Sequence, residues 1–237
     1  MFRRHKSGED GQAPTEATAD ATSDDMGDAP TDGATQQELA VAPAGPVGGT
    51  GPRDVSDPAI DPDAPRVDFG ALRVPGVDGM EVRVDADEAG NLIAVTVVID
   101  ETAIQMSAFA APRSGAVWDE IRGEISQAII DAGGSAHDEP GRFGPELVAD
   151  VVVTLPDGKN ATEPMRFVGS EGPRWFVRGL ISGRGAHDRA AARSVEDLFA
   201  GLIVDRGDHA APPREPLPLT LPAEASLSPE DDGSASG

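Results

Sequence analysis

The residues best suited to chemistry in this sequence are two arginines and a tryptophan that share one short stretch of the chain. If residues 174–182 form a strand, Arg174 and Arg178 project from one face of it and Trp175 projects from the other. A pair of guanidinium groups can hold a carboxylate or phosphate through parallel hydrogen bonds. The candidate ligand or partner surface therefore comprises Arg174, Arg178, Arg184, Arg113 and Trp175.

The same residues also have a purely structural interpretation. The chain has a formal net charge of -23, so its own carboxylates can neutralise these arginines. Exposed ion pairs of this kind contribute little free energy. Trp175 and Trp118 fit a hydrophobic core as well as they fit a binding platform. The sequence favours this structural interpretation and leaves ligand binding as the alternative.

Common catalytic and metal-binding patterns are absent from the sequence. There is no cysteine, which excludes disulfides, thiolate nucleophiles and cysteine-ligated metals. The sequence contains no phosphate-binding glycine loop, dinucleotide-binding glycine motif, H-E-x-x-H zinc motif or G-x-S-x-G nucleophile motif. The four histidines have no paired ligand spacing: His5, His137, His187 and His209. We therefore predict no catalytic residues, no metal site and no cofactor.

Two weak metal patterns have simpler interpretations. Asp85, Asp87 and Asn91 partly follow a calcium loop. Thr96 then stands where that loop requires a glutamate that binds through both oxygens, so the pattern is typical of a hairpin turn. The acidic stretch around His137 is interpreted as a solvated loop.

Hydrophobic periodicity between residues 66 and 206 predicts the elements that position these side chains. In the first half, the predicted strands and helix are residues 79–85, 92–99 and 102–110, then a helix from Val117 that ends before Gly133. In the second half they are strands at residues 147–155, 164–168 and 174–182, then a helix whose apolar face runs from Val195 to Ile203.

These elements predict an α+β fold. It is a single domain with a mostly antiparallel sheet, built from two successive β-β-β-α units with two helices on one face. Residues 1–65 and 226–237 have few large apolar side chains, so we predict disordered acidic tails there. The domain then spans residues 66–225, and its C-terminal part, residues 212–222, is expected to be a proline-containing extended arm on the body.

The overall charge limits the choice of partner. An acidic chain repels nucleic acid and anionic lipid at long range, so we predict binding to neither. The sequence has no apolar stretch of membrane-spanning length and no signal peptide, which predicts a soluble cytoplasmic protein without integral membrane association. The sequence does not fix the oligomeric state.

Several longer segments occur in a specific order: residues 67–75, 108–115, 117–120, 166–169, 172–179 and 216–219. In this order they resemble an actinobacterial family, the domain of unknown function 3710, over roughly Arg66 to Ala225. The resemblance implies an actinobacterial origin and a cytoplasmic compartment. It implies no activity, cofactor or functional residue.

Two classes of function remain open. The favoured class is a non-enzymatic protein-interaction module whose partner is an unidentified protein, with an exposed groove or sheet face partly covered by the proline-containing arm. The alternative is a small anionic ligand binder or an enzyme that uses an Arg cluster around Arg174 and Arg178. That alternative predicts that the arginines converge in one concave site beside an acid such as Glu120 or Glu171.

Overall fold

The computed structural model describes residues 35–39, 51–113, 117–155, 157–208 and 211–222. The predicted tail at residues 226–237 lies outside these ranges, and so does most of the predicted tail at residues 1–65. No helix in the described ranges is long and apolar enough to cross a membrane.

The described residues form twelve strands, two α-helices and one 3-10 helix. The strands are β1 (Thr35–Leu39), β2 (Arg53–Asp54), β3 (Arg66–Asp68), β4 (Leu72–Pro75), β5 (Glu81–Ala86), β6 (Leu92–Ile99), β7 (Thr102–Ala110), β8 (Ser135–Gly141), β9 (Gly144–Thr154), β10 (Asn160–Gly172), β11 (Trp175–Gly183) and β12 (Ile203–Val204). The helices are α1 (Val117–Asp131), α2 (Arg193–Ala200) and the 3-10 helix η1 (Arg184–Ala186).

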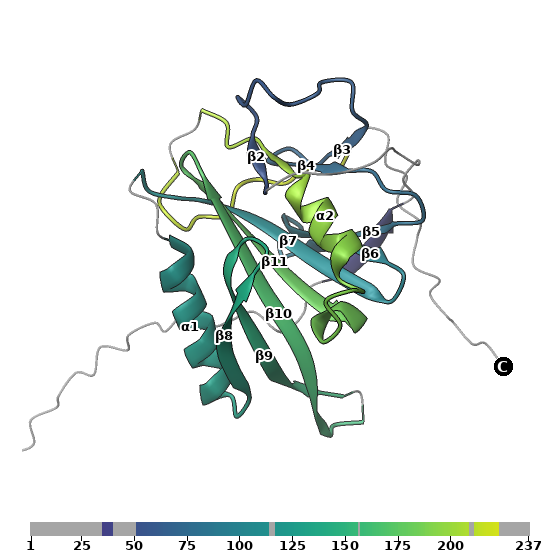
Figure 1. The fold of residues 1–237 in the computed structure, drawn as a ribbon, viewed down its shortest axis with the longest axis vertical. Coiled ribbons are helices and arrows are strands. Elements are labelled where there is room, and N and C mark those ends of the chain that lie inside the picture. The colour runs from purple at the N-terminus through teal and green to yellow at the C-terminus, as the bar shows by residue number, and fades with distance from the viewer. Residues whose placement is uncertain (1–34, 40–50, 114–116, 156, 209–210, 223–237) are drawn as a thin grey trace, which may run out of the picture. The chain divides into compact units, whose positions relative to one another are not determined.

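Eight strands form one antiparallel sheet in the order β1-β5-β6-β7-β11-β10-β9-β8 (Figure 1). One half of the sheet contains the consecutive strands β5, β6 and β7, and the other half contains β8 to β11. The halves meet where β7 pairs with β11, which places Arg178 opposite Ser107 near the centre of the sheet. The predicted α+β class, with a single domain of mostly antiparallel strands, is confirmed.

The first half of the sheet follows the sequence prediction. The carboxylate of Asp87 accepts hydrogen bonds from the main-chain N–H groups of Ala89 and Asn91, so the partial calcium pattern is a hairpin turn. Strand β7 covers the predicted residues 102–110. Helix α1 ends at Asp131, just before Gly133, whose φ of 87° is a conformation that favours glycine.

The second half contains a strand that the sequence analysis missed. Residues 135–141, which include the segment interpreted as a solvated loop around His137, pair with β9 as strand β8. Strand β8 is the last strand of the sheet, and most of its side chains are exposed or only half-buried. It therefore lacks the alternating apolar pattern by which a strand is recognised in a sequence. The second unit accordingly has four strands before its helix.

The two helices pack on opposite faces of the sheet, which corrects the prediction that both cover one face. Neighbouring residues of a strand point to opposite faces. In β11, Phe176 stacks on Trp118 of α1, with ring centroids 5.6 Å apart. On the other face, a Cβ placed on Gly179 would lie 3.1 Å from the ring of Phe199 in α2. Periodicity shows which side of a helix is apolar, but it does not show which sheet face the helix covers.

Each helix therefore closes its own apolar cluster. The larger cluster joins α2 to one face of the sheet and includes Val97, Ile104 and Phe199. The smaller cluster joins α1 to the other face and includes Trp118 and Phe176. The central strand β11 contributes side chains to both clusters, so it is packed on both faces.

A second sheet, in the order β2-β12-β4-β3, extends the body into the predicted N-terminal tail. Its strand β2 pairs in parallel with β12. Since β2 lies before Arg66, the folded body begins earlier than the sequence boundary suggested. The chain near residues 202–204, which fitted either a helix end or an extended segment, is extended as β12.

The proline-containing arm lies on the body. The main-chain N–H of Leu217 donates to the carbonyl of Ala108, and that of Thr220 donates to the carbonyl of Phe69. The side chains of Leu217 and Leu219 are buried in the larger cluster. The arm therefore completes the core at the end of β7.

Candidate functional site

A row of three aromatic rings with an arginine at each end runs along the sheet face that carries α1. Its centre is Phe176 of β11, whose ring lies 6.0 Å from that of Phe109 in β7 and 5.6 Å from that of Trp118. The guanidinium group of Arg178 lies 5.8 Å from the centroid of Phe109, and that of Arg122 lies 5.8 Å from that of Trp118. A guanidinium group at this distance is attracted by the face of an aromatic ring.

Trp118 is held in this row by two hydrogen bonds and a glycine. Its indole N–H donates to the carbonyl of Pro145 at 2.7 Å, and its main-chain N–H donates to Glu171 Oε1 at 2.6 Å. The carboxylate thus satisfies one of the unpaired N–H groups in the first turn of α1. A Cβ on Gly169 would lie 2.4 Å from the indole, so only glycine leaves room for it. Trp118 is therefore a core residue that docks α1 on the sheet.

Arg178 differs from Arg122 in lacking a counter-ion. Arg122 contacts the carboxylates of Asp119 at 2.7 Å and Asp138 at 2.9 Å. In the described part of the chain, no carboxylate pairs with Arg178, whose contact is the ring of Phe109. The side chain is half-buried, and burial lowers the pKa of its guanidinium group. A partly desolvated cation without an anion is unexpected in a chain with a net charge of -23.

Arg174 lies in a turn, so strand alternation does not place it beside Arg178. Gly172 pairs with Trp175, which leaves Pro173 and Arg174 as the two central residues of the turn between β10 and β11. Arg174 has a φ of 62°, in a turn position that normally favours glycine. Its side chain is exposed. The predicted pair of guanidinium groups on one strand face is therefore not formed.

Trp175 lies on the opposite sheet face from Arg178 and is buried in the larger cluster. Its indole N–H donates to Asp54 Oδ2 at 2.8 Å. Burial alone would raise the pKa of Asp54. Hydrogen bonds from Ser56 and Trp175, together with the charge of Arg174, hold that pKa below its usual value. Trp175 is therefore a core residue that also fastens the segment containing β2.

An open hollow of about 690 Å³ lies beside Trp175. It is lined by Gly51, Pro52, Arg53, Asp54, Ser56, Asp57, Pro58, Ala59, Glu171, Gly172, Pro173 and Trp175. Asp54 is bonded to Trp175, and Glu171 is bonded to the first turn of α1. These two carboxylates of the hollow thus join segments of the fold, and none of the four candidate arginines lines it.

The other two candidate arginines lie at opposite ends of the sheet. Arg184, in η1 beyond the end of β11, contacts Glu101 at 3.6 Å and Asp188 at 3.4 Å. Arg113 is exposed after β7, near the turn that contains Arg174, because the N–H of Ala111 bonds to the carbonyl of Arg174 at 2.9 Å. The candidate arginines are therefore spread along β11. A role of this surface in binding stays a prediction.

Sequence comparison connects this fold to a family. The profile of a protein family of unknown function, DUF3710, matches residues 51–227. The chain belongs to this family. No curated protein and no solved structure matches the chain. The matched range contains every strand from β2 to β12 and excludes β1.

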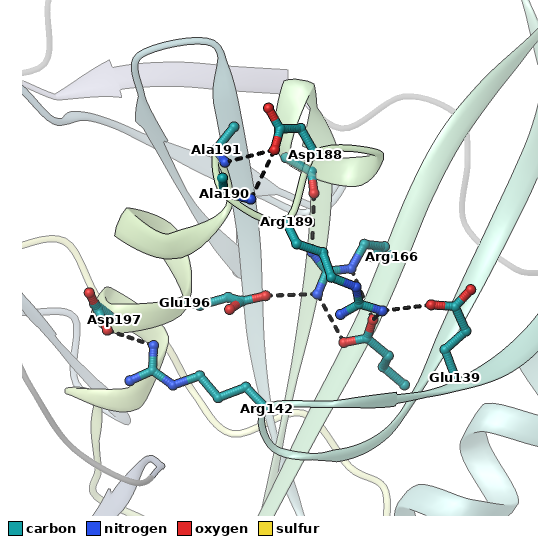
Figure 2. A network of polar contacts seen from close by, with 11 residues as sticks. Glu139, Arg142, Arg166, Asp188, Arg189, Ala190, Ala191, Glu196 and Asp197 are labelled. Atoms are coloured by element: carbon teal, nitrogen blue, oxygen red, sulfur yellow. Dashed lines mark hydrogen bonds and ion pairs between the residues drawn. The ribbon is translucent and has the colours of Figure 1, made fainter.

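The DUF3710 domain contains a buried ion-pair network that the sequence analysis missed (Figure 2). Arg166 of β10 is 2% exposed. It makes two hydrogen bonds to Glu146, at 3.0 and 2.9 Å, and one to Glu196 at 2.7 Å. Arg189 also contacts Glu146 at 2.7 Å. Burial alone would lower the pKa of Arg166, but the bonds to Glu146 and Glu196 raise it.

The network joins elements that are far apart in the sequence. Glu146 lies on β9, Arg166 on β10 and Glu196 on α2, and Arg166 also donates to the carbonyl of Gly185 in η1 at 3.1 Å. The sequence signal for it is weak. Arg166 occupies an inward position of a strand, but nothing near it in the chain identifies its acidic partners.

No group of three histidine or carboxylate residues in the described ranges is placed to hold a metal ion. His137 forms a hydrogen bond with Glu139 at 3.1 Å. The same carboxylate contacts Arg189 at 2.7 Å. These contacts tie β8 to the buried network.

The outer edge of the DUF3710 sheet is occupied by a strand from outside the matched range. Strand β1 pairs antiparallel with β5, which places Leu39 opposite Val82, Glu38 opposite Arg83 and Gln36 opposite Asp85. Within the matched residues alone, β5 would be the end strand of the sheet.

Asp85 gives this edge an unusual polar group. Its side chain is buried, and Oδ2 accepts hydrogen bonds from Thr96 and Gln105 at 2.9 Å each. Its other oxygen, Oδ1, is buried and has no hydrogen-bond partner among the side chains and main chain that the structure describes. An unpaired buried acceptor is costly, so a donor on an adjoining strand would be stabilising.

Proposed function

We propose that the DUF3710 domain is a non-enzymatic protein-interaction module that binds an extended segment of a partner protein along β5. The observation that carries this proposal is that Thr35–Leu39, outside the matched family range, pairs with that edge. An end strand offers unpaired N–H and C=O groups to any extended chain. In this type of recognition, main-chain pairing provides affinity and alternate side chains provide specificity.

The proline-containing arm supports the proposal because it is a second extended segment held through main-chain hydrogen bonds. The N–H of Ala110 donates to the carbonyl of Glu215, and the N–H of Leu217 donates to the carbonyl of Ala108. The arm also buries the side chain of Leu217. The same sheet therefore holds extended chain at two places, along β5 and at the end of β7.

The register defines the chemistry of the partner segment. Opposite Val82, whose side chain is in the core, an apolar residue is favoured, as at Leu39. A carboxylate is favoured opposite Arg83, and a hydrogen-bond donor is favoured opposite Asp85. The expected partner segment therefore has four consecutive positions in this order: a hydrogen-bond donor, any residue, an acidic residue and an apolar residue. Each such cross-strand pair contributes roughly 0.2–1 kcal/mol, so selectivity requires several of them.

Strand β1 and the partner would compete for the same edge. Residues 40–50 connect β1 to the rest of the body. Because the two segments belong to one chain, β1 meets this edge at an effective concentration on the order of millimolar. A free segment of equal intrinsic affinity therefore binds only weakly until β1 leaves. In this proposal the N-terminal part of the chain regulates access to the edge.

Two proline variants test this competition: one should release β1 and expose the edge of β5, and the other should leave β1 paired. The turn between β6 and β7 has two residues, so Ile99 and Thr102 are its first hydrogen-bonded pair. Along a strand, the main-chain N–H and C=O groups of successive residues point alternately to the two neighbouring strands. Counting from that pair through β6 to β5, the N–H and C=O groups of Val84 point toward β1. Those of Gln37, which lies opposite Val84, therefore point toward β5. Because proline has no N–H, Gln37→Pro should release β1, whereas Gln36→Pro, one position along, is the matched control.

The proposal is tested by fluorescence anisotropy with a labelled peptide of residues 33–41 and the full-length variants. The peptide should bind Gln37→Pro about tenfold or more tightly than it binds wild type or Gln36→Pro, because the tethered competitor is gone. Adding Arg83→Glu should weaken binding, and a peptide carrying Glu38→Lys should restore it.

Failure of the peptide to bind a Gln37→Pro variant that circular dichroism shows to be folded would contradict the proposal. If light scattering shows that Gln37→Pro is a dimer and that the peptide dissociates it, the edge would instead be assigned to a second copy of the chain.

The alternative function, binding of a small anion by an Arg cluster, has support at one residue. Arg184 is paired with its own acids, and Arg174 and Arg113 are exposed near one end of the sheet. Among these four arginines, only Arg178 combines partial burial with the absence of a carboxylate partner in the described ranges. An anion site would therefore be built around Arg178 rather than around a cluster.

A further inference from the structure

We propose that Arg178 and Ser107 form a binding site for a carboxylate attached to an apolar or aromatic group. The two residues lie directly opposite each other on β11 and β7, so their side chains project from the same face. The Cβ atoms of such a pair are about 4.5–5.5 Å apart. A guanidinium group and a hydroxyl group at this spacing can donate hydrogen bonds to one carboxylate.

The first argument is the contrast with neighbouring arginines. On the same sheet face, Arg122 and Arg214 each contact two carboxylates. The nearby carboxylate of Glu171 is occupied by the first turn of α1. In the described part of the chain, neither the guanidinium group of Arg178 nor the hydroxyl group of Ser107 has a hydrogen bond or ion pair. The protein thus supplies acids to the surrounding cations and leaves these two donors available.

The second argument is energetic. Removing a cation from water costs more than the attraction of an aromatic ring returns. The ring of Phe109 lies 5.8 Å from the guanidinium group of Arg178 and therefore compensates only part of this cost. Burial also lowers the pKa of Arg178, which has the direction expected for a cation that lacks an anion. A bound carboxylate would supply the missing charge and acceptor atoms.

The third argument is the apolar wall around the guanidinium group. Phe109 and Leu180 are half-buried, belong to the smaller cluster and lie on the same sheet face as Arg178. Gly169, opposite Arg178 on β10, has no side chain, and the indole of Trp118 lies over it. The donors are thus bordered by aromatic and aliphatic surface. Such a surface favours an aromatic carboxylate over a small hydrated anion such as acetate or phosphate.

The probe for this site is phenylacetate, added to the full-length protein while the arginine side-chain N–H signals are followed by NMR. Phenylacetate should shift the Arg178 signal saturably and should bind about tenfold more tightly than acetate or inorganic phosphate, because the ring adds apolar contact. Phenethylamine, with the same ring and a positive charge, should not bind.

Matched variants assign the effect to the two donors. Arg178→Gln should reduce the affinity for phenylacetate about tenfold or more, since it removes charge-assisted hydrogen bonds. Ser107→Ala should reduce it about threefold through the loss of one neutral hydrogen bond. Arg174→Gln, which changes an exposed arginine in the neighbouring turn, should leave the affinity unchanged.

A carboxylate could come from a small molecule or from the C-terminus of a protein, and two further probes separate these sources. A tripeptide ending in phenylalanine is compared with phenylacetate and with its own C-terminal amide. Tighter binding of the tripeptide acid assigns the site to a protein terminus. Tighter binding of phenylacetate assigns it to a small carboxylate.

The proposal has a clear failure. It is overturned if phenylacetate causes no saturable shift at millimolar concentration, or if it binds equally to wild type and to the Arg178 variants. If Arg178→Gln does not fold, Arg178→Lys keeps the charge and removes the two-pronged geometry. That variant should remain folded and should still bind phenylacetate more weakly than wild type.

Discussion

Arg166 and Arg178 lie on adjacent strands of the same sheet, but they face opposite sides and have opposite surroundings. Arg166, on the face covered by α2, is fully buried and bonded to Glu146 and Glu196. Arg178, on the face covered by α1, is half-buried over Phe109 and has no carboxylate partner in the described ranges. The same type of side chain therefore closes the fold on one face and remains available for binding on the other.

This difference shows that an arginine's burial does not by itself identify its role. A buried arginine with two carboxylates joins elements, because its partners come from β9 and α2. An arginine with an aromatic ring and no anion retains unused donors. The four predictions below separate these roles, in decreasing order of the expected effect.

The largest effect is expected for Arg166→Met. Removing the cation takes from Glu196 its arginine partner and leaves Glu146 with the contact to Arg189 alone, which should lower the free energy of unfolding by about 3–5 kcal/mol. Urea denaturation of the full-length protein measures this change. The control is Arg184→Met, whose ion pairs are exposed and should contribute less than about 1 kcal/mol.

A companion variant tests why Arg166→Met is destabilising. Replacing Glu146 and Glu196 by leucine in the Arg166→Met background should recover most of the loss, because no unpaired charge remains. A single Arg166→Met variant as stable as wild type would show that the network does not hold α2 to the sheet.

Gly169→Ala should have the next largest effect, on the Arg178 face. The added Cβ would meet the indole of Trp118 at 2.4 Å, so the helix or the ring must shift. Overpacking of this kind costs about 1–3 kcal/mol. Gly123→Ala is the matched control, because nothing lies within 4 Å of its added Cβ and alanine favours a helix by about 1 kcal/mol. The midpoint temperature of thermal unfolding should fall for Gly169→Ala and rise for Gly123→Ala.

Arg178→Met should change stability by less than about 1 kcal/mol, and in the stabilising direction, because it removes a desolvated cation without leaving a carboxylate unpaired. The measurement is the same urea titration as for Arg166→Met. A loss as large as that of Arg166→Met would show that Arg178 has a counter-ion in the folded chain, and the distinction between the two faces would be wrong.

The smallest effect is expected at Asp54, which is partly exposed. Its pKa is lowered in the folded protein, where its carboxylate accepts hydrogen bonds from Ser56 and Trp175. A lowered pKa stabilises the fold above the unfolded value, near pH 4, and this contribution disappears as the pH falls through the folded pKa. Ser56→Ala should raise the pKa of Asp54 toward its usual value in an NMR titration.

Because Asp54 is partly exposed, Ser56→Ala should change stability above pH 4 by no more than about 0.5 kcal/mol. Denaturation at pH 3 and pH 7 measures this contribution. A pKa for Asp54 that does not change in the variant would show that Ser56 has no part in lowering it.

The sequence by itself determined the features that depend on neighbours in the chain. Alternation identified β5 and β7, β-branched residues identified β6, helical spacing identified α1, and turn residues identified the hairpin at Asp87. The ordered segments also identified the family, which the profile match confirms. These features are local, because a strand or a helix shows its buried side within a few residues.

Only the tertiary structure decided how these elements combine. It placed α1 and α2 on opposite faces, gave Arg166 two acids from distant elements and put Arg174 in a turn instead of beside Arg178. It also revealed β8, a polar edge strand that is held by its pairing with β9 and has no alternating apolar pattern. A repeating pattern fixes which side chains share a face, whereas the packing of distant segments fixes what that face meets.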